Sequence, residues 1–132
     1  MSRDTVRPSA SPGAAVLVVD DELALCNAIR MILELEGYRV TLATSGKEAL
    51  ERVRAERPGV VFLDLRMPGM DGLETYGVLH ERDPELPVIF MTAKDRVRQE
   101  VAAHHAAGAL PKPFDVDLVL DTVARFLPSP AP

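Results

Sequence analysis

The stretch VLVVDDELAL, residues 16–25, runs four apolar residues straight into three acidic ones, Asp20, Asp21 and Glu22. A short apolar run without alternation is typical of a strand that is buried on both faces. The acids that follow it have two interpretations. They can stabilise the N-terminus of a helix, by about 0.3–1 kcal/mol each, or they can surround a cation at the end of the strand. The residues that follow the other apolar runs decide between the two.

Similar apolar runs return along the chain, and segments with helical spacing lie between them. The runs cover residues 40–42, 60–63, 88–91 and, weakly, 109–110. The helical segments are marked by Leu25, Ile29 and Ile32 before Gly37, by the capping box Ser45–Glu48, by Asp71 and Glu74, by Val97 and Val101, and by the apolar residues from Val116 to Leu127. Five strands that alternate with five helices predict an α/β fold with a doubly wound, parallel sheet and helices on both faces.

Composition and charge exclude several classes of protein. The chain has 132 residues, 47% of them hydrophobic, which fits one domain with a substantial core. Its formal net charge is −5, and Lys and Arg form no block, so direct contact with nucleic acid is not expected. No apolar run approaches the ~20 residues of a membrane span, so no membrane contact is expected either. The single cysteine, Cys26, fits a reducing cytoplasm.

The two ends of the chain differ in composition from the rest. Residues 1–13 are rich in Ser and Pro and predict a flexible N-terminal lead. One folded domain is expected over residues 14–127. The segment 128–132, PSPAP, predicts a short tail or the stub of a linker.

Polar residues follow most of the predicted strands, at the point where each strand ends. Asp20 and Asp21 follow the first run, Asp64 the third, Thr92 the fourth and Lys112 the fifth. Right-handed crossovers place the carboxyl ends of all these strands at one edge of the sheet, which is where open α/β sheets bind their ligands. We therefore expect three carboxylates, one hydroxyl and one ammonium group to converge there.

This set of groups predicts a site for a divalent cation and a phosphoryl group. Close carboxylates repel each other by roughly 4 kcal/mol per pair at an effective dielectric constant near 20, so such a cluster takes up protons or binds a cation. Ligands that are all oxygen favour a hard ion, and a small number of them favours Mg²⁺ over Ca²⁺. Asp64, alone at the end of the central run, is the candidate acceptor, whereas Asp20 and Asp21 are suited to holding the metal. Lys112 supplies a point charge for the same phosphate.

Four motifs in order carry a resemblance to a known family. They are VLVVDDE at 16–22, VFLDLRMPGMDG at 61–72, VIFMTA at 88–93 and KPFD at 112–115. With them the sequence resembles the receiver domain of two-component response regulators over about 110 residues. The resemblance implies a flavodoxin-like (βα)5 fold with strand order 2-1-3-4-5.

The resemblance also implies a role for each residue of the predicted site. Asp64 matches the phosphorylated aspartate, Thr92 the hydroxyl that turns towards the phosphoryl group, and Lys112 the lysine that pairs with it through a cis bond to Pro113. For the metal, Asp21 matches the direct Mg²⁺ ligand, Asp20 a ligand that acts largely through water, and Arg66 the residue whose backbone carbonyl completes the protein ligands.

The function implied by the resemblance is that of a switch. A sensor histidine kinase or a phosphotransfer protein would donate the phosphoryl group, and the domain would catalyse only its own phosphorylation and dephosphorylation. Whether such a chain counts as an enzyme stays open. The downstream protein partner is not identified by the sequence, and a homodimer is compatible with it.

Two departures from the family pattern motivate an alternative. The 20 positions from Thr92 to Lys112 are fewer than the family spacing, and Ala109 stands where an aromatic residue is common. The chain could therefore be a pseudo-receiver, a protein-interaction module that works without phosphorylation, or it could signal through its fourth helix. An aspartyl phosphatase is disfavoured because Arg66 stands where the second aspartate of that class belongs. A dinucleotide-binding domain is disfavoured because no GxGxxG follows the first strand.

Charged residues of the predicted fourth helix have no assigned role in this scheme. Arg96, Arg98 and Glu100 are interpreted as a solvated helix face, with a partner surface as the alternative.

Overall fold

The computed structural model describes residues 14–67, 72–104 and 106–128; the predicted lead (1–13), Asp71 and residues 129–132 lie outside them. The elements in chain order are β1 (Val16–Val19), α1 (Leu23–Leu35), β2 (Val40–Ala43), α2 (Gly46–Ala55), β3 (Val60–Asp64), α3 (Gly72–Arg82), β4 (Val88–Ala93), the 3-10 turn η2 (Lys94–Arg96), α4 (Val97–His104), β5 (Gly108–Lys112) and α5 (Val116–Ala124).

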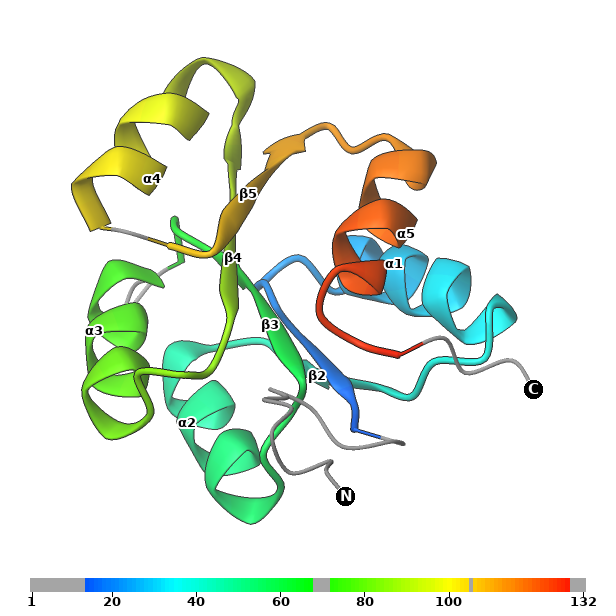
Figure 1. The fold of residues 1–132 in the computed structure, drawn as a ribbon, viewed down its shortest axis with the longest axis horizontal. Helices are drawn as coiled ribbons and strands as arrows, with labels where there is room; N and C mark the ends of the chain where they lie inside the picture. The colour runs from blue at the N-terminus through cyan, green and yellow to red at the C-terminus, as the bar shows by residue number, and fades with distance from the viewer. Residues whose placement is uncertain (1–13, 68–71, 105, 129–132) are drawn as a thin grey trace, which may run out of the picture.

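The five strands form one parallel sheet in the order β2-β1-β3-β4-β5 (Figure 1). The alternation of apolar runs and helical segments correctly predicted the fold class, and the resemblance correctly implied the strand order. The central strand, β3, is flanked by β1 and β4, and all five of its residues are buried. Within the described residues, no helix combines the length and the apolar character that a membrane span requires.

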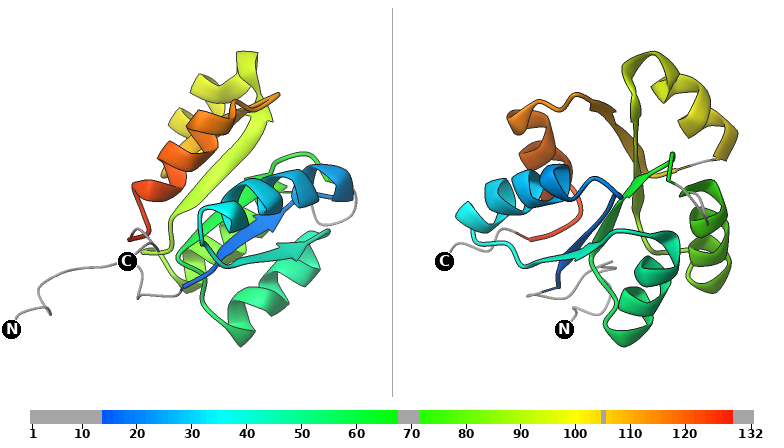
Figure 2. Two further views of the ribbon diagram at one scale, coloured as in Figure 1. Left: turned by 90° about the vertical axis from the view of Figure 1, so that its right-hand side faces the viewer. Right: turned by 180° about the vertical axis from the view of Figure 1, so that it is seen from behind.

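Helices cover both faces of the sheet, as the unbroken apolar strands predict. Helices α1 and α5 pack on one face, and α2, α3 and α4 on the other (Figures 1 and 2). Successive residues of a strand point to opposite faces, so Phe62 of β3 lies in the core beneath α1 and α5, whereas Phe90 of β4 lies in the core beneath the other three helices. Both rings are fully buried. The sheet is thus held rigidly from both sides, which fixes the positions of its strand ends.

The predicted strands are too short at their carboxyl ends. Strand β3 continues through Asp64, β4 through Thr92 and Ala93, and β5 through Lys112. The reason is that the backbone pairing continues past the last apolar residue: Asp64 pairs with Met91, and Ala93 pairs with Lys112. Asp64, Thr92 and Lys112 therefore stand on the sheet itself rather than on the loops that follow it.

Local sequence signals fix the first two helices. Helix α1 ends in a Schellman motif, in which Gly37 has a φ of 95° and the N–H groups of Gly37 and Tyr38 donate to the carbonyls of Glu34 and Leu33. Helix α2 begins at the predicted cap, where the Ser45 hydroxyl accepts a hydrogen bond from the N–H of Glu48 at 3.1 Å.

We expect Ser45→Ala to lower the free energy of unfolding by about 1 kcal/mol, because the Glu48 N–H at the start of α2 loses its acceptor. Urea denaturation followed by circular dichroism measures this loss. Ser45→Asp is the matched control, since it keeps an acceptor at the cap and should stay within a few tenths of a kcal/mol of the wild type. An unchanged midpoint for the alanine variant would show that the cap contributes nothing.

Candidate functional site

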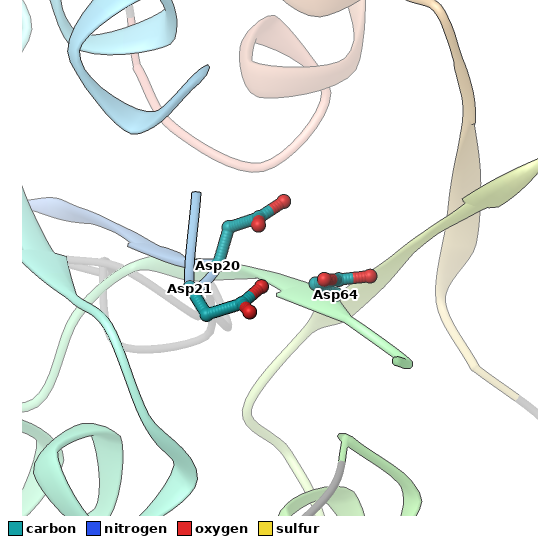
Figure 3. A group of neighbouring side chains, drawn as sticks. All are labelled: Asp20, Asp21 and Asp64. Atoms are coloured by element: carbon teal, nitrogen blue, oxygen red, sulfur yellow. The ribbon is translucent and has the colours of Figure 1, made fainter. Parts of the chain in front are cut away.

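Three carboxylates gather at the carboxyl edge of the sheet. Asp20 and Asp21 directly follow β1, and Asp64 ends β3, the strand beside it. Each offers an oxygen atom, and these atoms lie within 4.8 Å of one another. Figure 3 shows the side chains of Asp20 and Asp21 extending from the end of β1 towards Asp64. Asp20 is 1% and Asp64 4% exposed, whereas Asp21 is exposed to solvent, so the cluster is buried on one side and open on the other.

The backbone around Asp20 holds its side chain in place. Its Oδ1 accepts a hydrogen bond from the N–H of Glu22 at 2.9 Å, and its backbone carbonyl accepts one from the Cys26 Sγ at 3.3 Å. Burial and the charge of Asp20 raise the pKa of Cys26 to about 11, so the thiol stays protonated at neutral pH and can remain a donor. The Cys26 thiol therefore helps to hold the backbone of Asp20 in place.

Lys112 bridges two of the carboxylates from the other side of the cluster. Its Nζ lies 2.8 Å from Asp20 Oδ2 and 3.4 Å from Asp64 Oδ1. Burial alone lowers the pKa of Lys112, but the hydrogen bond and charge of Asp20, together with the charge of Asp64, outweigh it and raise that pKa. The bond to Pro113 is cis, as the resemblance implied.

The carboxyl group of Asp64 sits in an environment that disfavours its charge. Burial is the largest cause that raises its pKa, and the charge of Asp20 adds to it. The Arg66 N–H, which donates to Asp64 Oδ1 at 3.1 Å, and the ammonium of Lys112 act in the opposite direction. Buried carboxylates with a perturbed pKa are typical of functional sites. Such a group favours the binding of a cation or an electrophile.

An open cleft of about 370 Å³ gives access to these groups. Its lining residues are Asp20, Asp21, Glu22, Asp64, Arg66, Thr92, Ala93, Arg96 and Lys112. All six residues predicted from the sequence are among them. Thr92, in β4 next to Asp64's strand, is buried. The cleft has an acidic wall at β1 and basic side chains on the opposite rim.

Two other residues of the site, Arg96 and Gly72, were missed by sequence reasoning. Arg96 lines the cleft, although the sequence indicated a solvated helix face or a partner surface for it; Glu22, which the sequence placed beside Asp20 and Asp21, lines the cleft as well. Gly72, the first residue of α3, lies so close to the end of β3 that an added Cβ would stand 2.5 Å from the Cα of Leu65, and closer still to the carbonyl oxygen of Asp64. The signal in the sequence is the DG pair that ends the second motif, at positions 71 and 72.

The donor set fits a magnesium ion. Mg²⁺ binds hard oxygen ligands at about 2.0–2.1 Å in an octahedron and usually keeps several waters. Asp20, Asp21 and Asp64 supply carboxylate oxygens from one side only, and the open side of the cleft leaves room for water and for phosphate oxygens. The Lys112 ammonium pairs with two of these three carboxylates, Asp20 and Asp64.

Comparison with known proteins matches the chain to one family. A sequence model of the response regulator receiver domain matches residues 16–124. The response regulator MprA of Mycolicibacterium vanbaalenii is 40% identical over 114 residues, which are 85% of this chain and 49% of that protein. The probable transcriptional regulatory protein TcrX of Mycobacterium tuberculosis is 41% identical over 107 residues, 80% of this chain and 46% of that protein. The chain thus spans about half the length of these curated relatives.

Solved structures share the same fold. The receiver domain of NtrX from Brucella abortus superposes with a TM-score of 0.79 at 31% identity, covering 85% of this chain and 97% of that domain. The response regulator TrrA from Thermotoga maritima, solved in complex with Mg²⁺ and BeF, superposes with a TM-score of 0.78 at 31% identity and covers 86% of this chain and 99% of its own.

Proposed function

Because this chain belongs to the family of response regulator receiver domains of two-component systems, we propose that Asp64 accepts a phosphoryl group in the presence of Mg²⁺ and that the domain changes conformation when it does. The observation that supports this most strongly is the meeting of Asp64 with two other carboxylates and one ammonium group in a single open cleft. Strands β3 and β5 and the two residues that directly follow β1 contribute these groups, so their meeting is a property of the fold and not of one sequence segment.

The residues of the cleft that were predicted from the sequence each have a part in this proposal. Asp20 and Asp21, with the backbone carbonyl of Arg66, would hold the metal. A bound Mg²⁺ would supply charge neutralisation for the phosphoryl oxygens. Lys112 would leave Asp64 and pair with the phosphoryl group, and the Thr92 hydroxyl would donate a hydrogen bond to it.

The reaction transfers one phosphoryl group between two proteins. An Asp64 carboxylate oxygen forms the new O–P bond, and the N–P bond of a phosphohistidine breaks. The imidazole leaves with the electron pair and takes a proton from solvent. We propose a sensor histidine kinase or a phosphotransfer protein as the donor, in line with the family. TcrX is a probable transcriptional regulatory protein. We therefore propose that this chain also regulates transcription, without itself contacting nucleic acid.

The proposal is tested by incubating the chain with phosphoramidate and Mg²⁺ and resolving the products on a Phos-tag gel. We expect one retarded species with Mg²⁺, and none when the metal is removed with EDTA. Absence of the retarded species at any donor concentration would favour the pseudo-receiver alternative.

We expect Lys112→Met to tighten Mg²⁺ binding about tenfold, because removing a positive charge beside Asp20 and Asp64 removes a competitor for the metal. The same change should slow phosphorylation, since the phosphoryl group loses its ammonium partner. Isothermal titration with MgCl₂ measures the first effect. Lys47→Met, an exposed residue of α2 outside the cleft lining, is the charge-matched control. Equal Mg²⁺ affinity in both variants would contradict the competition.

A further inference from the structure

Arg96 belongs both to the wall of the cleft and to the start of α4. It ends η2, the turn that joins β4 to α4, and its side chain lines the cleft together with Asp64 and Lys112. At present its Nη2 lies 3.2 Å from Glu100 Oε2, one turn further along α4. Arg96 thus lines the cleft and also forms an ion pair with a residue of α4.

The partner of Arg96 connects the cleft to the core. Glu100 Oε1 lies 3.7 Å from His104 Nε2 at the end of α4. The His104 ring meets Phe90 edge-on at 6.1 Å, and the His104 carbonyl accepts a hydrogen bond of 2.9 Å from the Tyr76 hydroxyl of α3. A series of contacts therefore runs from Arg96 along α4 to the aromatic residues beneath it.

At the position of β5 that pairs with Phe90, the side chain is small. Ala109 of β5 stands beside Phe90 in the sheet and is too small to move between two positions. A conformational signal that leaves the cleft towards α4 has a direct connection through Arg96.

We propose that Arg96 binds the phosphoryl group on Asp64, leaves Glu100 to do so, and thereby reports phosphorylation to α4. This inference rests on the proposed function of Asp64. Its physical basis is an exchange of partners. The Arg96 side chain is 45% exposed and the Glu100 side chain 15%, and an i,i+4 ion pair whose cation is open to solvent contributes only about 0.3–0.5 kcal/mol. A phosphoryl group offers more negative charge and three acceptor oxygens, which a planar guanidinium can bind through two parallel hydrogen bonds.

The other two cations of the cleft are less suited to this role. Lys112 lies on β5, an edge strand of the sheet, and its Nζ donates a hydrogen bond of 2.8 Å to Asp20 Oδ2. Arg66 follows β3 and donates its backbone N–H to Asp64, so its movement would act on the loop after β3. Arg96 differs from both because its ion-pair partner is a residue of α4.

The first test is a double-mutant cycle on the affinity for beryllofluoride, an acyl phosphate mimic, measured by NMR titration in excess Mg²⁺. Arg96→Gln should weaken binding about fivefold, because a charge-assisted hydrogen bond is lost at a partly exposed site. Glu100→Gln should strengthen it about twofold, since Arg96 no longer has to leave an i,i+4 partner. The double variant should match Arg96→Gln alone, because the two residues act through one contact. Arg52→Gln, which breaks the similar pair with Glu48 on α2, should leave the affinity unchanged.

The second test follows hydrogen exchange of the amides of residues 97–104. Saturating beryllofluoride should raise exchange in the wild type about twofold, the size expected for the loss of one i,i+4 ion pair. Arg96→Gln and Glu100→Gln should show the raised exchange without the mimic and no further response to it. Arg52→Gln should respond like the wild type.

The outcomes separate this inference from the proposed function. If the wild type binds beryllofluoride and Arg96→Gln matches it in both affinity and α4 exchange, the role of Arg96 is wrong and that of Asp64 stands. If the wild type does not bind beryllofluoride with Mg²⁺, the proposed function fails and the inference fails with it.

Discussion

Asp64→Asn is expected to abolish phosphoryl uptake. The amide has nearly the same shape as the carboxylate, but its nitrogen and neutral oxygen are poor nucleophiles, so no O–P bond should form at this position. The loss should be at least about a thousandfold in the rate of phosphorylation, in keeping with the removal of a covalent nucleophile. The measurement is the Phos-tag assay with phosphoramidate and Mg²⁺, followed over time.

The same variant should remain folded, which makes the result interpretable. Burial raises the pKa of Asp64, so its charge is costly in the folded state and its removal should not lower the free energy of unfolding. The control is Asp121→Asn, an exposed residue of α5, which should be phosphorylated like the wild type. Full phosphorylation of the Asp64 variant would place the acceptor elsewhere in the chain.

The second large effect is expected for Gly72→Ala. The added methyl group would stand 2.5 Å from the Cα of Leu65, where only backbone movement can relieve the overlap. Overpacking of this kind costs about 1–3 kcal/mol. The displaced backbone is that of Asp64 and Leu65, so the reacting carboxylate should move as well. A misplacement on the order of 1 Å can slow a reaction about a hundredfold, and we expect that loss in the phosphorylation rate.

Gly77→Ala is the matched control for this prediction. Gly77 lies in the same helix, α3, and an added Cβ there would meet nothing within 4 Å. Alanine inside a helix is preferred over glycine by about 0.5–1 kcal/mol, so this variant should be more stable than the wild type and equally reactive. The account of Gly72 is wrong if its alanine variant unfolds at the wild-type urea concentration and phosphorylates at the wild-type rate.

The fold could be predicted because its signals are local and repeated. The runs at Val16–Val19 and Val60–Leu63 are apolar without alternation, which is typical of a strand covered on both faces, and both runs are fully buried. Parallel strands then bring residues such as Asp20 and Asp64 to one edge, although 44 positions separate them in the sequence. The meeting of the carboxylates with Lys112 follows from topology alone.

The remaining features depend on atomic positions and distances, which a sequence pattern does not give. Whether Gly72 tolerates a side chain is decided by how closely α3 approaches β3, and this distance follows from the packing of both cores. Arg96 was interpreted as solvated because charged residues at helical spacing usually are. Its side chain is indeed 45% exposed, but the short turn η2 before α4 also places it at the rim of the cleft. The extension of β3 through Asp64 depends on backbone pairing with Met91, which is independent of side-chain polarity.

The identity of the residue that carries the phosphoryl group tests the central claim most directly. The phosphorylated chain is reduced with borohydride, which converts an aspartyl phosphate to homoserine, and the peptides are sequenced by mass spectrometry. We predict homoserine at position 64 and unmodified aspartate at positions 20 and 21, with no conversion when Mg²⁺ is withheld. Homoserine at another position, or none in a chain that binds Mg²⁺ and is exposed to the donor, would contradict the account.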